Sequence, residues 1–196
     1  MKFGSCFLMM FSFFLVYMYT VKSSSIVYRS VWIVVYEDWV SKKDGTVGMF
    51  NRICVQDATT IVPIFDDCSL LMVENYRHGP RTSLLELPGG LIKINEEPSI
   101  AAKRELLEET GYESNILEYI NWTYTWPGRT AQKNFVFVAK GLKKCSEPNL
   151  EEFEYTKIRK LTKEQTMQEI RSGNIKSAIT ISAILYALVQ SPNVNL

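Results

Sequence analysis

The segment from Gly90 to Tyr112, GLIKINEEPSIAAKRELLEETGY, constrains the fold of this chain more than any other. It reads as a loop followed by one helix. The pair Gly89-Gly90 marks a position where the backbone bends tightly. Pro98 suits the first helical turn because its missing N–H would have no partner there, and Gly111 suits the position that ends a helix. The segment therefore predicts a helix over about 98–110.

Three glutamates on this helix, Glu105, Glu108 and Glu109, are spaced to share one face. Three carboxylates this close repel one another by roughly 0.2–0.5 kcal/mol per pair on an exposed helix. A hard divalent cation would turn that repulsion into binding, and Mg²⁺ is usually held by a few carboxylates together with substrate phosphates. Taken alone, however, a run of charges such as this is more often a solvated helix face.

The spacing of the fixed residues separates these two interpretations. They form the pattern G-x5-E-x7-R-E-L-x-E-E-x-G, from Gly90 through Glu96 and Arg104 to Gly111. This pattern resembles the signature of the Nudix hydrolase family at every charged and glycine position. It departs only at Tyr112, where the family usually has an aliphatic residue for packing. The resemblance implies an α+β fold, the Nudix α/β/α sandwich with a mixed β-sheet, and hydrolysis of a nucleoside diphosphate linked to another group.

Residues outside the signature bear on the substrate. The run VENYRHGPRTSLLELPGGLI (73–92) and Pro127, sixteen residues beyond Gly111, resemble the ADP-ribose (ADP-sugar) pyrophosphatase branch, and this resemblance covers about residues 26–190. It implies Mg²⁺-dependent hydrolysis of ADP-ribose or a related nucleoside diphosphate sugar to AMP and a sugar phosphate. Other Nudix substrates stay open, among them other nucleotide sugars, dinucleoside polyphosphates and oxidised nucleoside triphosphates. So does a Nudix-fold module that binds nucleotides without catalysis.

The resemblance also assigns metal-binding and catalytic roles by position. It implies that Mg²⁺, with Mn²⁺ as an alternative, is held by Glu105, Glu108, Glu109 and the Gly90 carbonyl, with Glu96 as a further candidate. Arg104 would hold a carboxylate in place. The general base would come from the acidic loop 147–154, where Glu152 is the first choice and Glu151 the second. The expected catalytic set is therefore Glu152, Glu109, Glu105 and Arg104.

Four residues form the expected substrate-binding set. Arg77 would face the diphosphate, since a planar guanidinium can clasp oxygens in pairs. Trp32 would stack on adenine; the alternative is a core residue of a strand. Pro127 would shape the pocket near the terminal ribose; the alternative is a plain turn proline. Glu86 completes the set. The single histidine, His78, follows Arg77, and a loop histidine without a partner is more often structural.

Composition limits the partners and the compartment. A net charge of +1 without a basic cluster argues against a nucleic-acid-binding face. The four cysteines are scattered and include no C-x-x-C pair, which argues against a zinc site. Three of them lie beyond the apolar leader that holds Cys6, and this odd number indicates reduced thiols in an intracellular domain. The branch resemblance implies a homodimer in which the N-terminal strands, within 26–55, cross between subunits.

Residues 1–25 form an apolar leader, and residues 26–196 form the expected Nudix domain. Residues 3–21 contain no charge and are about long enough to span a bilayer. They would be a signal-anchor helix, a cleaved secretory signal or an over-extended start. We expect a cytoplasmic catalytic domain, with a membrane anchor through 3–21 as one arrangement; secretion is less favoured.

The rest of the chain alternates between strand and helix patterns. A hairpin turn is expected at Asp44-Gly45, and Pro63 is expected at a sheet edge or bend. Two C-terminal helices are expected at about 162–171 and 175–190, the second apolar enough to pack against the sheet. The β-branched and aromatic runs predict strands at 26–36, 47–55, 59–65, 69–77, 84–87, 116–124 and 134–139.

Overall fold

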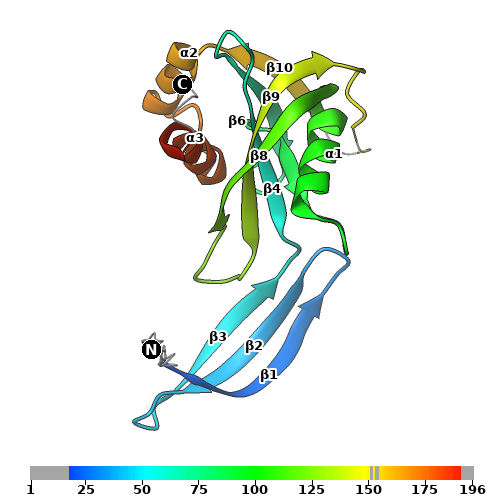
Figure 1. The fold of residues 1–196 in the computed structure, drawn as a ribbon. Coiled ribbons are helices and arrows are strands. Elements are labelled where there is room, and N and C mark those ends of the chain that lie inside the picture. Colours follow the sequence, from blue (N-terminus) through cyan, green and yellow to red (C-terminus); the bar gives the residue numbers. More distant parts are fainter. Residues whose placement is uncertain (1–17, 151, 153–154, 191–196) are drawn as a thin grey trace, which may run out of the picture.

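A computed structural model describes residues 18–150, 152 and 155–190 of the chain (Figure 1). In this part of the chain there are ten strands and three helices. The strands are β1 (Thr20–Arg29), β2 (Val34–Ser41), β3 (Val47–Cys54), β4 (Ala58–Pro63), β5 (Leu70–Arg77), β6 (Thr82–Glu86), β7 (Gly89–Leu91), β8 (Tyr112–Tyr124), β9 (Lys133–Lys144) and β10 (Thr156–Leu161). The helices are α1 (Pro98–Thr110), α2 (Lys163–Arg171) and α3 (Ala178–Gln190).

Two sheets form the centre of the fold. One has the order β7-β4-β9-β8, with β4 and β9 parallel and the other pairs antiparallel; the second has the order β10-β5-β6 and is antiparallel. Helix α1 packs on one side, where Ala102 and Leu106 meet Ile61. Helix α3 packs on the other, where Ala183 and Ile184 join a second buried cluster. The mixed sheet between helices confirms the α+β architecture and the packing of the last helix (Figure 1).

Helix α1 has the bounds that the sequence predicts. Pro98 is its first residue, and Gly111 ends it in the left-handed conformation, with φ 71°. The Gly111 N–H donates to the Leu107 carbonyl at 2.7 Å, which satisfies one of the last helical carbonyls. A Cβ atom at Gly111 would stand 2.0 Å from the Ser146 carbonyl oxygen. This glycine is therefore required both by its φ and by the close passage of the chain after β9.

The first three strands form a separate sheet with the order β1-β2-β3, which extends away from the other two (Figure 1). The single strand expected at 26–36 is wrong, because the chain reverses between β1 and β2. The N–H groups of Trp32 and Ile33 both donate to the Ser30 hydroxyl oxygen, and this local bonding stabilises the reversal. The turn expected at Asp44-Gly45 is confirmed: it joins β2 to β3, and Gly45 has φ 87°.

Strands β7 and β10 were not expected from the sequence, and the other strands differ from expectation mainly in length. Strand β8 begins at Tyr112 rather than near residue 116, and β9 continues to Lys144 rather than ending at 139. Their antiparallel pairing runs from Tyr112 opposite Lys144 to Tyr124 opposite Lys133, so cross-strand contacts extend both strands beyond their apolar runs. Pro63 is the last residue of β4, which lies between β7 and β9. The proline is thus at a strand end but not on an edge strand.

Most of the expected leader, residues 1–17, lies outside the described residues. Strand β1 begins at Thr20, so it starts inside the segment that the sequence set apart as 1–25. Among the described residues, no helix combines the length and apolar character needed to cross a bilayer. Cys54, Cys68 and Cys145 are free cysteines.

We predict that Gly111→Ala destabilises the domain more than Gly173→Ala does. Both glycines have φ near 70°, so both variants adopt a strained backbone that costs about 1 kcal/mol or more. Only at Gly111 would the added Cβ also meet a backbone oxygen, because nothing lies within 4 Å of a Cβ at Gly173. Chemical denaturation of the two variants measures the difference. Equal losses of stability would show that the contact with Ser146 is unimportant.

Candidate active site

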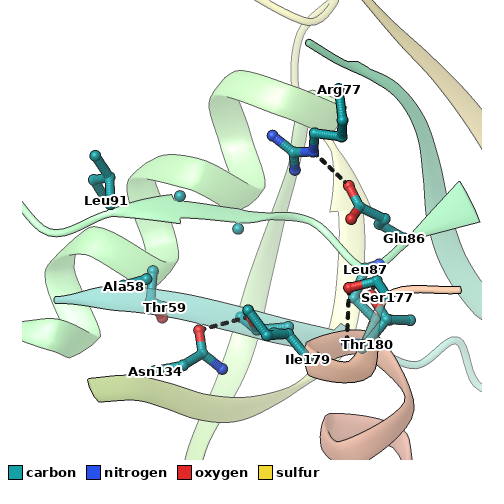
Figure 2. A pocket seen from close by; sticks show the side chains of 13 residues that line it. Ala58, Thr59, Arg77, Glu86, Leu87, Leu91, Asn134, Ser177, Ile179 and Thr180 are labelled. Atoms are coloured by element: carbon teal, nitrogen blue, oxygen red, sulfur yellow. Dashed lines mark hydrogen bonds and ion pairs between the residues drawn. The ribbon is translucent and has the colours of Figure 1, made fainter. Parts of the chain in front are cut away.

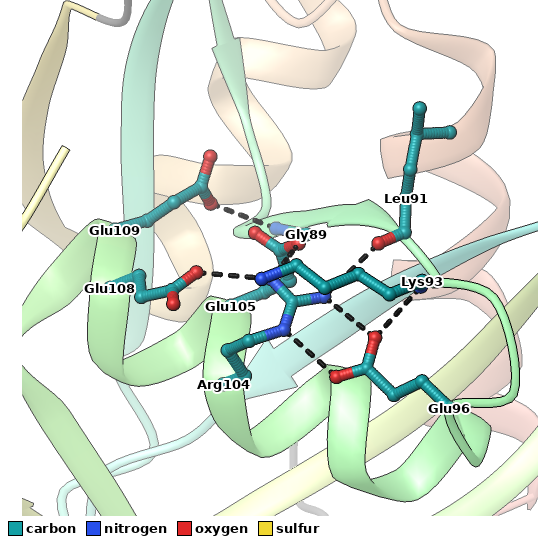
Figure 3. Close-up of polar contacts among 8 residues, drawn as sticks. All are labelled: Gly89, Leu91, Lys93, Glu96, Arg104, Glu105, Glu108 and Glu109. Carbon is teal, nitrogen blue, oxygen red and sulfur yellow. Dashed lines mark hydrogen bonds and ion pairs between the residues drawn. The ribbon is translucent and has the colours of Figure 1, made fainter. Parts of the chain in front are cut away.

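One guanidinium group organises the loop-helix segment. Arg104 binds both oxygens of Glu96 through Nε and Nη2, each at 2.9 Å, and it also donates to the Leu91 carbonyl at 3.1 Å. Its Nη1 lies 2.6 Å from Glu105 and 3.0 Å from Glu108 (Figure 3). The hydrogen bonds from Arg104 lower the pKa of Glu96 to about 2. Arg104 therefore ties three carboxylates and the end of β7 together.

The third signature glutamate has a different environment. Glu109 is 4% exposed. Its two oxygens accept hydrogen bonds from the Gly89 N–H at 2.8 Å and from the Asn75 side chain at 3.2 Å. Burial raises the pKa of Glu109 to about 8, and the nearby Glu105 adds to the rise, whereas Gly89, Arg77 and Asn75 act against it. Without a cation, this carboxyl is held in place but is costly to ionise.

The loop passes directly beneath Glu105. A Cβ atom at Gly90 would lie 2.5 Å from the Glu105 carboxylate, so glycine is needed here for the approach of backbone to carboxylate. Strand β7 pairs with β4, with Gly90 opposite Thr59. This pairing fixes the position of the loop relative to the helix. The sheet thus determines how the loop and the glutamates meet.

The carboxylates line a hollow of about 240 Å³. Its wall includes Glu105, Glu108 and Glu109 from α1 and Gly90 from the loop. Two of the expected substrate-binding residues, Arg77 at the end of β5 and Trp32 from the β1–β2 turn, also line it. Trp32 is 68% exposed, so its interpretation as a strand core residue is wrong. Metal-binding and substrate-binding candidates thus share one hollow.

The donor set suits a hard divalent cation, because it consists of carboxylate oxygens beside the Gly90 backbone. The carboxylates do not converge on one point, however. In the described ranges, no three Asp, Glu, His or Cys side chains lie close enough together to hold an ion. Arg104 instead occupies the space between Glu105 and Glu108. Since Mg²⁺ keeps several waters and often takes substrate phosphates, this set fits a cation whose coordination is completed by substrate oxygens.

The remaining expected residues have varied positions. Glu86 is buried and accepts a hydrogen bond from Arg77 Nε at 2.7 Å, so it orients the guanidinium. Pro127 does not line this hollow within the same chain. It lies in the β8–β9 loop, beside β3 residues such as Phe50. Glu152 is exposed in the segment before β10, and residues 151 and 153–154 lie outside the described residues. His78 is exposed in the turn after β5.

One residue near the carboxylates was missed by the sequence analysis. Asn75 is 5% exposed; it donates to Glu109 and accepts from the Thr156 hydroxyl at 2.5 Å. Thr156 is the first residue of β10, so this chain of bonds joins the strand after the acidic loop to the carboxylate face. A polar residue inside the apolar run LLMVENY was the available signal, since buried polar groups need partners.

Comparisons with known proteins agree with this geometry. The NUDIX domain family matches residues 55–176. The chain is 34% identical over 134 residues to the methanol dehydrogenase activator of Bacillus methanolicus, covering 68% of this chain and 72% of the relative. It is 32% identical over 155 residues to the ADP-ribose pyrophosphatase of Bacillus subtilis, covering 79% and 84%. A crystal structure of an ADP compounds hydrolase has the same fold, with TM-score 0.81 and 24% identity over 90% of this chain and 96% of that one.

We predict that Glu109 makes the metal-free protein less stable as pH rises. Its pKa is raised from 4.5 to about 8 in the folded state, so the folded state binds the extra proton. The stabilising contribution of the Glu109 proton is fully present below pH 4.5. Above that pH the free energy of unfolding falls by up to about 1.4 kcal/mol per pH unit until the folded pKa of about 8 is reached. Unfolding of the wild type and of Glu109→Gln in EDTA, from pH 5 to pH 9, measures this.

In that series, the free energy of unfolding of the wild type should fall relative to that of Glu109→Gln as pH increases. The exposed Glu113→Gln provides the matched control, because it makes the same chemical change on β8 and should follow the wild type at every pH. If wild type and Glu109→Gln keep a constant difference from pH 5 to 9, the carboxyl is not held in its neutral form.

Proposed function

The chain belongs to the Nudix hydrolase family, and we propose that it hydrolyses the diphosphate of ADP-ribose or a related nucleoside diphosphate sugar, giving AMP and a sugar phosphate. The observation that carries this proposal is the single hollow shared by the signature glutamates, Arg77 and Trp32. The similarity to a protein named ADP-ribose pyrophosphatase supports the same substrate class. The metal-binding carboxylates share this hollow with the cationic side chain of Arg77 and the exposed indole of Trp32. This combination suits a diphosphate attached to a base.

We assign the roles by position in this hollow. Glu105, Glu108, Glu109 and the Gly90 carbonyl would hold a divalent cation, Mg²⁺ or Mn²⁺. When bound, the cation would neutralise the charge of the diphosphate and lower the pKa of the attacking water. Arg104 keeps Glu105 and Glu108 in position.

The substrate and the water each have an assigned group. Arg77, oriented by Glu86, would bind phosphate oxygens in pairs. The exposed ring of Trp32 offers a face for the base. Glu152, in the acidic loop, remains our candidate for the general base that takes the proton of the attacking water; Glu151 is the second choice.

The N-terminal sheet supports a homodimer as part of this proposal. All ten residues of β1 are exposed, including Val27 and Tyr28, and β3 exposes Met49 and Phe50. A three-stranded sheet with this much uncovered apolar surface gains stability from a covering partner. A second copy of the chain would supply such a cover symmetrically. It would also bring another subunit's loops near the hollow, which gives Pro127 a route to a site that it does not reach in its own chain.

We predict that the full chain hydrolyses ADP-ribose in the presence of Mg²⁺ and that EDTA abolishes the activity. A panel that measures the nucleoside monophosphate produced would compare ADP-ribose, ADP-glucose, GDP-mannose, a dinucleoside polyphosphate and an oxidised nucleoside triphosphate. Glu109→Gln should lower turnover by orders of magnitude because the metal face loses a charged ligand, while Glu113→Gln should keep it. Near-normal turnover by Glu109→Gln would rule out the metal assignment, and binding of ADP-ribose without any turnover would favour a non-catalytic module.

We predict that the protein has about twice the mass of the 22.5 kDa chain in solution. Val27→Glu, which places a charge on β1, should shift it toward the monomer. Val189→Glu is the matched control, since it makes the same change at an exposed residue of α3 outside the sheet. Sedimentation or light scattering of the three proteins measures the mass. A monomeric wild type, or dissociation by both variants alike, would contradict a dimer through this sheet.

A further inference from the structure

Strand β5 carries two polar side chains near its end, and each is oriented by a residue of a neighbouring strand. Arg77 donates to Glu86 of β6 at 2.7 Å, and it lines both the carboxylate hollow and a cavity of about 200 Å³ beneath α3 (Figure 2). Asn75, two residues earlier, lies on the same face of the strand. Asn75 donates to Glu109 at 3.2 Å and accepts from Thr156 of β10 at 2.5 Å. The proposed function gives Arg77 a role, whereas Asn75 has none so far.

The direction of the bonds around Asn75 follows from the chemistry of its partners. A charged carboxylate can only accept hydrogen bonds, so the NH2 end of the amide faces Glu109. The amide oxygen then faces Thr156, whose hydroxyl group donates to it. Thr156 lies directly opposite Asn75 in the antiparallel β5–β10 pair, where side chains on one face are close neighbours. The bonds therefore run in one direction, from the Thr156 hydroxyl through the amide to the Glu109 carboxylate.

This arrangement holds Glu109 and still leaves it able to bind a cation. Its Oε1 accepts from Asn75, and its Oε2 accepts from the Gly89 N–H at 2.8 Å. A carboxylate offers about four lone-pair sites, so each oxygen keeps one site that these two donors do not use. Glu109 lines the carboxylate hollow, and Asn75 does not. Asn75 therefore orients a side chain of the hollow without reaching the hollow itself.

A purely structural role is the alternative, since any buried amide needs partners. The residues before Asn75 on β5 argue for more than that. Residues 70–73 are buried and apolar, and an apolar residue at position 75 would continue their packing. It would, however, leave Glu109 Oε1 without the donor that Asn75 provides. The one polar interruption in this buried run thus serves a carboxylate of the signature.

We propose that Asn75, held by Thr156, is a positioning residue that orients Glu109 to bind the divalent cation. The inference rests on the proposed function, because it takes Glu109 as a ligand of that cation. Groups that hydrogen-bond to a metal ligand fix its orientation, and their loss typically lowers metal affinity or activity about 10–100-fold. Asn75 thus sets how strongly the carboxylate face holds its cation.

The test measures Mn²⁺ binding to the full chain without substrate, by the electron paramagnetic resonance signal of the free ion. Asn75→Leu removes both polar ends of the amide at similar size, and it should raise the Kd for Mn²⁺ about 10–100-fold. A merely structural role would lower the number of binding sites with the folded fraction and leave that Kd unchanged. A Kd for Mn²⁺ equal to or below that of the wild type overturns the proposal.

The hydrolysis assay gives a second measurement on the same variant. Asn75→Leu should need about 10–100-fold more Mg²⁺ for half-maximal turnover. Its KM for ADP-ribose at saturating Mg²⁺ should match the wild type, because Asn75 does not line the hollow. A raised KM with an unchanged Mg²⁺ requirement would mean that Asn75 acts on the substrate, which contradicts the proposal.

A pair of variants at Thr156 keeps the test valid if Asn75→Leu does not fold. Thr156→Val removes the hydroxyl at the same shape and should weaken Mn²⁺ about twofold to tenfold, the effect of one hydrogen bond. Thr156→Ser keeps the hydroxyl and should bind Mn²⁺ as the wild type does. Asn121→Leu, on β8, is the matched control for Asn75→Leu and should also leave the Kd unchanged. Equal Mn²⁺ affinity of the valine and serine variants would overturn the role of Thr156 in holding the amide.

Mn²⁺ binding and hydrolysis together separate this inference from the proposed function. If the wild type binds Mn²⁺ but hydrolyses nothing, the proposed function fails, and the Mn²⁺ affinities of the variants still decide the role of Asn75. If the wild type hydrolyses ADP-ribose and all variants bind Mn²⁺ alike, only the present inference fails. A wild type that binds no Mn²⁺ overturns the metal assignment and this inference with it.

Discussion

The structure around the signature helix depends on the ion pairs that Arg104 makes with neighbouring glutamates. Three glutamates project from α1 toward a loop, and Glu105 and Glu108 would repel each other there if no cationic group lay between them. Arg104 opposes this repulsion by binding Glu105 and Glu108 while clasping Glu96 across the loop. Because the same guanidinium also holds the Leu91 carbonyl, the charge balance of the helix fixes the position of β7. One side chain therefore holds two of the glutamates and the loop together.

The three signature glutamates differ in how deeply they are buried. Glu108 is more than one third exposed at its side chain, Glu105 lies against the Gly90 backbone, and Glu109 is enclosed. Asn75 and the Gly89 N–H orient the enclosed carboxyl. Enclosure raises its pKa, so a charged Glu109 needs a cation as a neighbour, and binding a cation and ionising Glu109 become coupled events.

Strand β7 has only three residues, yet its residues line both the carboxylate hollow and the cavity beneath α3. A Cβ at Gly89 would stand 2.2 Å from the Thr59 carbonyl oxygen, so the strand lies directly on β4. This thinness lets Arg77 reach both the carboxylate hollow and the cavity beneath α3.

Local sequence patterns were sufficient to predict the helix, its face of glutamates and the loop before it. These features rest on local rules: Pro98 and Gly111 bound α1 at the residues expected, and the i, i+3, i+4 spacing sets the face in any helix. The turn at Asp44-Gly45 follows from the same kind of local chemistry. Residue patterns within a few positions were sufficient because the forces that act there are short in range.

Which distant residues share the site depends on how the chain packs in three dimensions. Trp32 comes beside the carboxylates because Ser30 reverses the chain, whereas Pro127 is carried away by the long β8–β9 pair. Asn75 bonds to Glu109 and Thr156 in a buried position, which no spacing in the sequence reveals. Its amide would be ordinary on an exposed strand and needs such partners only because packing removes it from water.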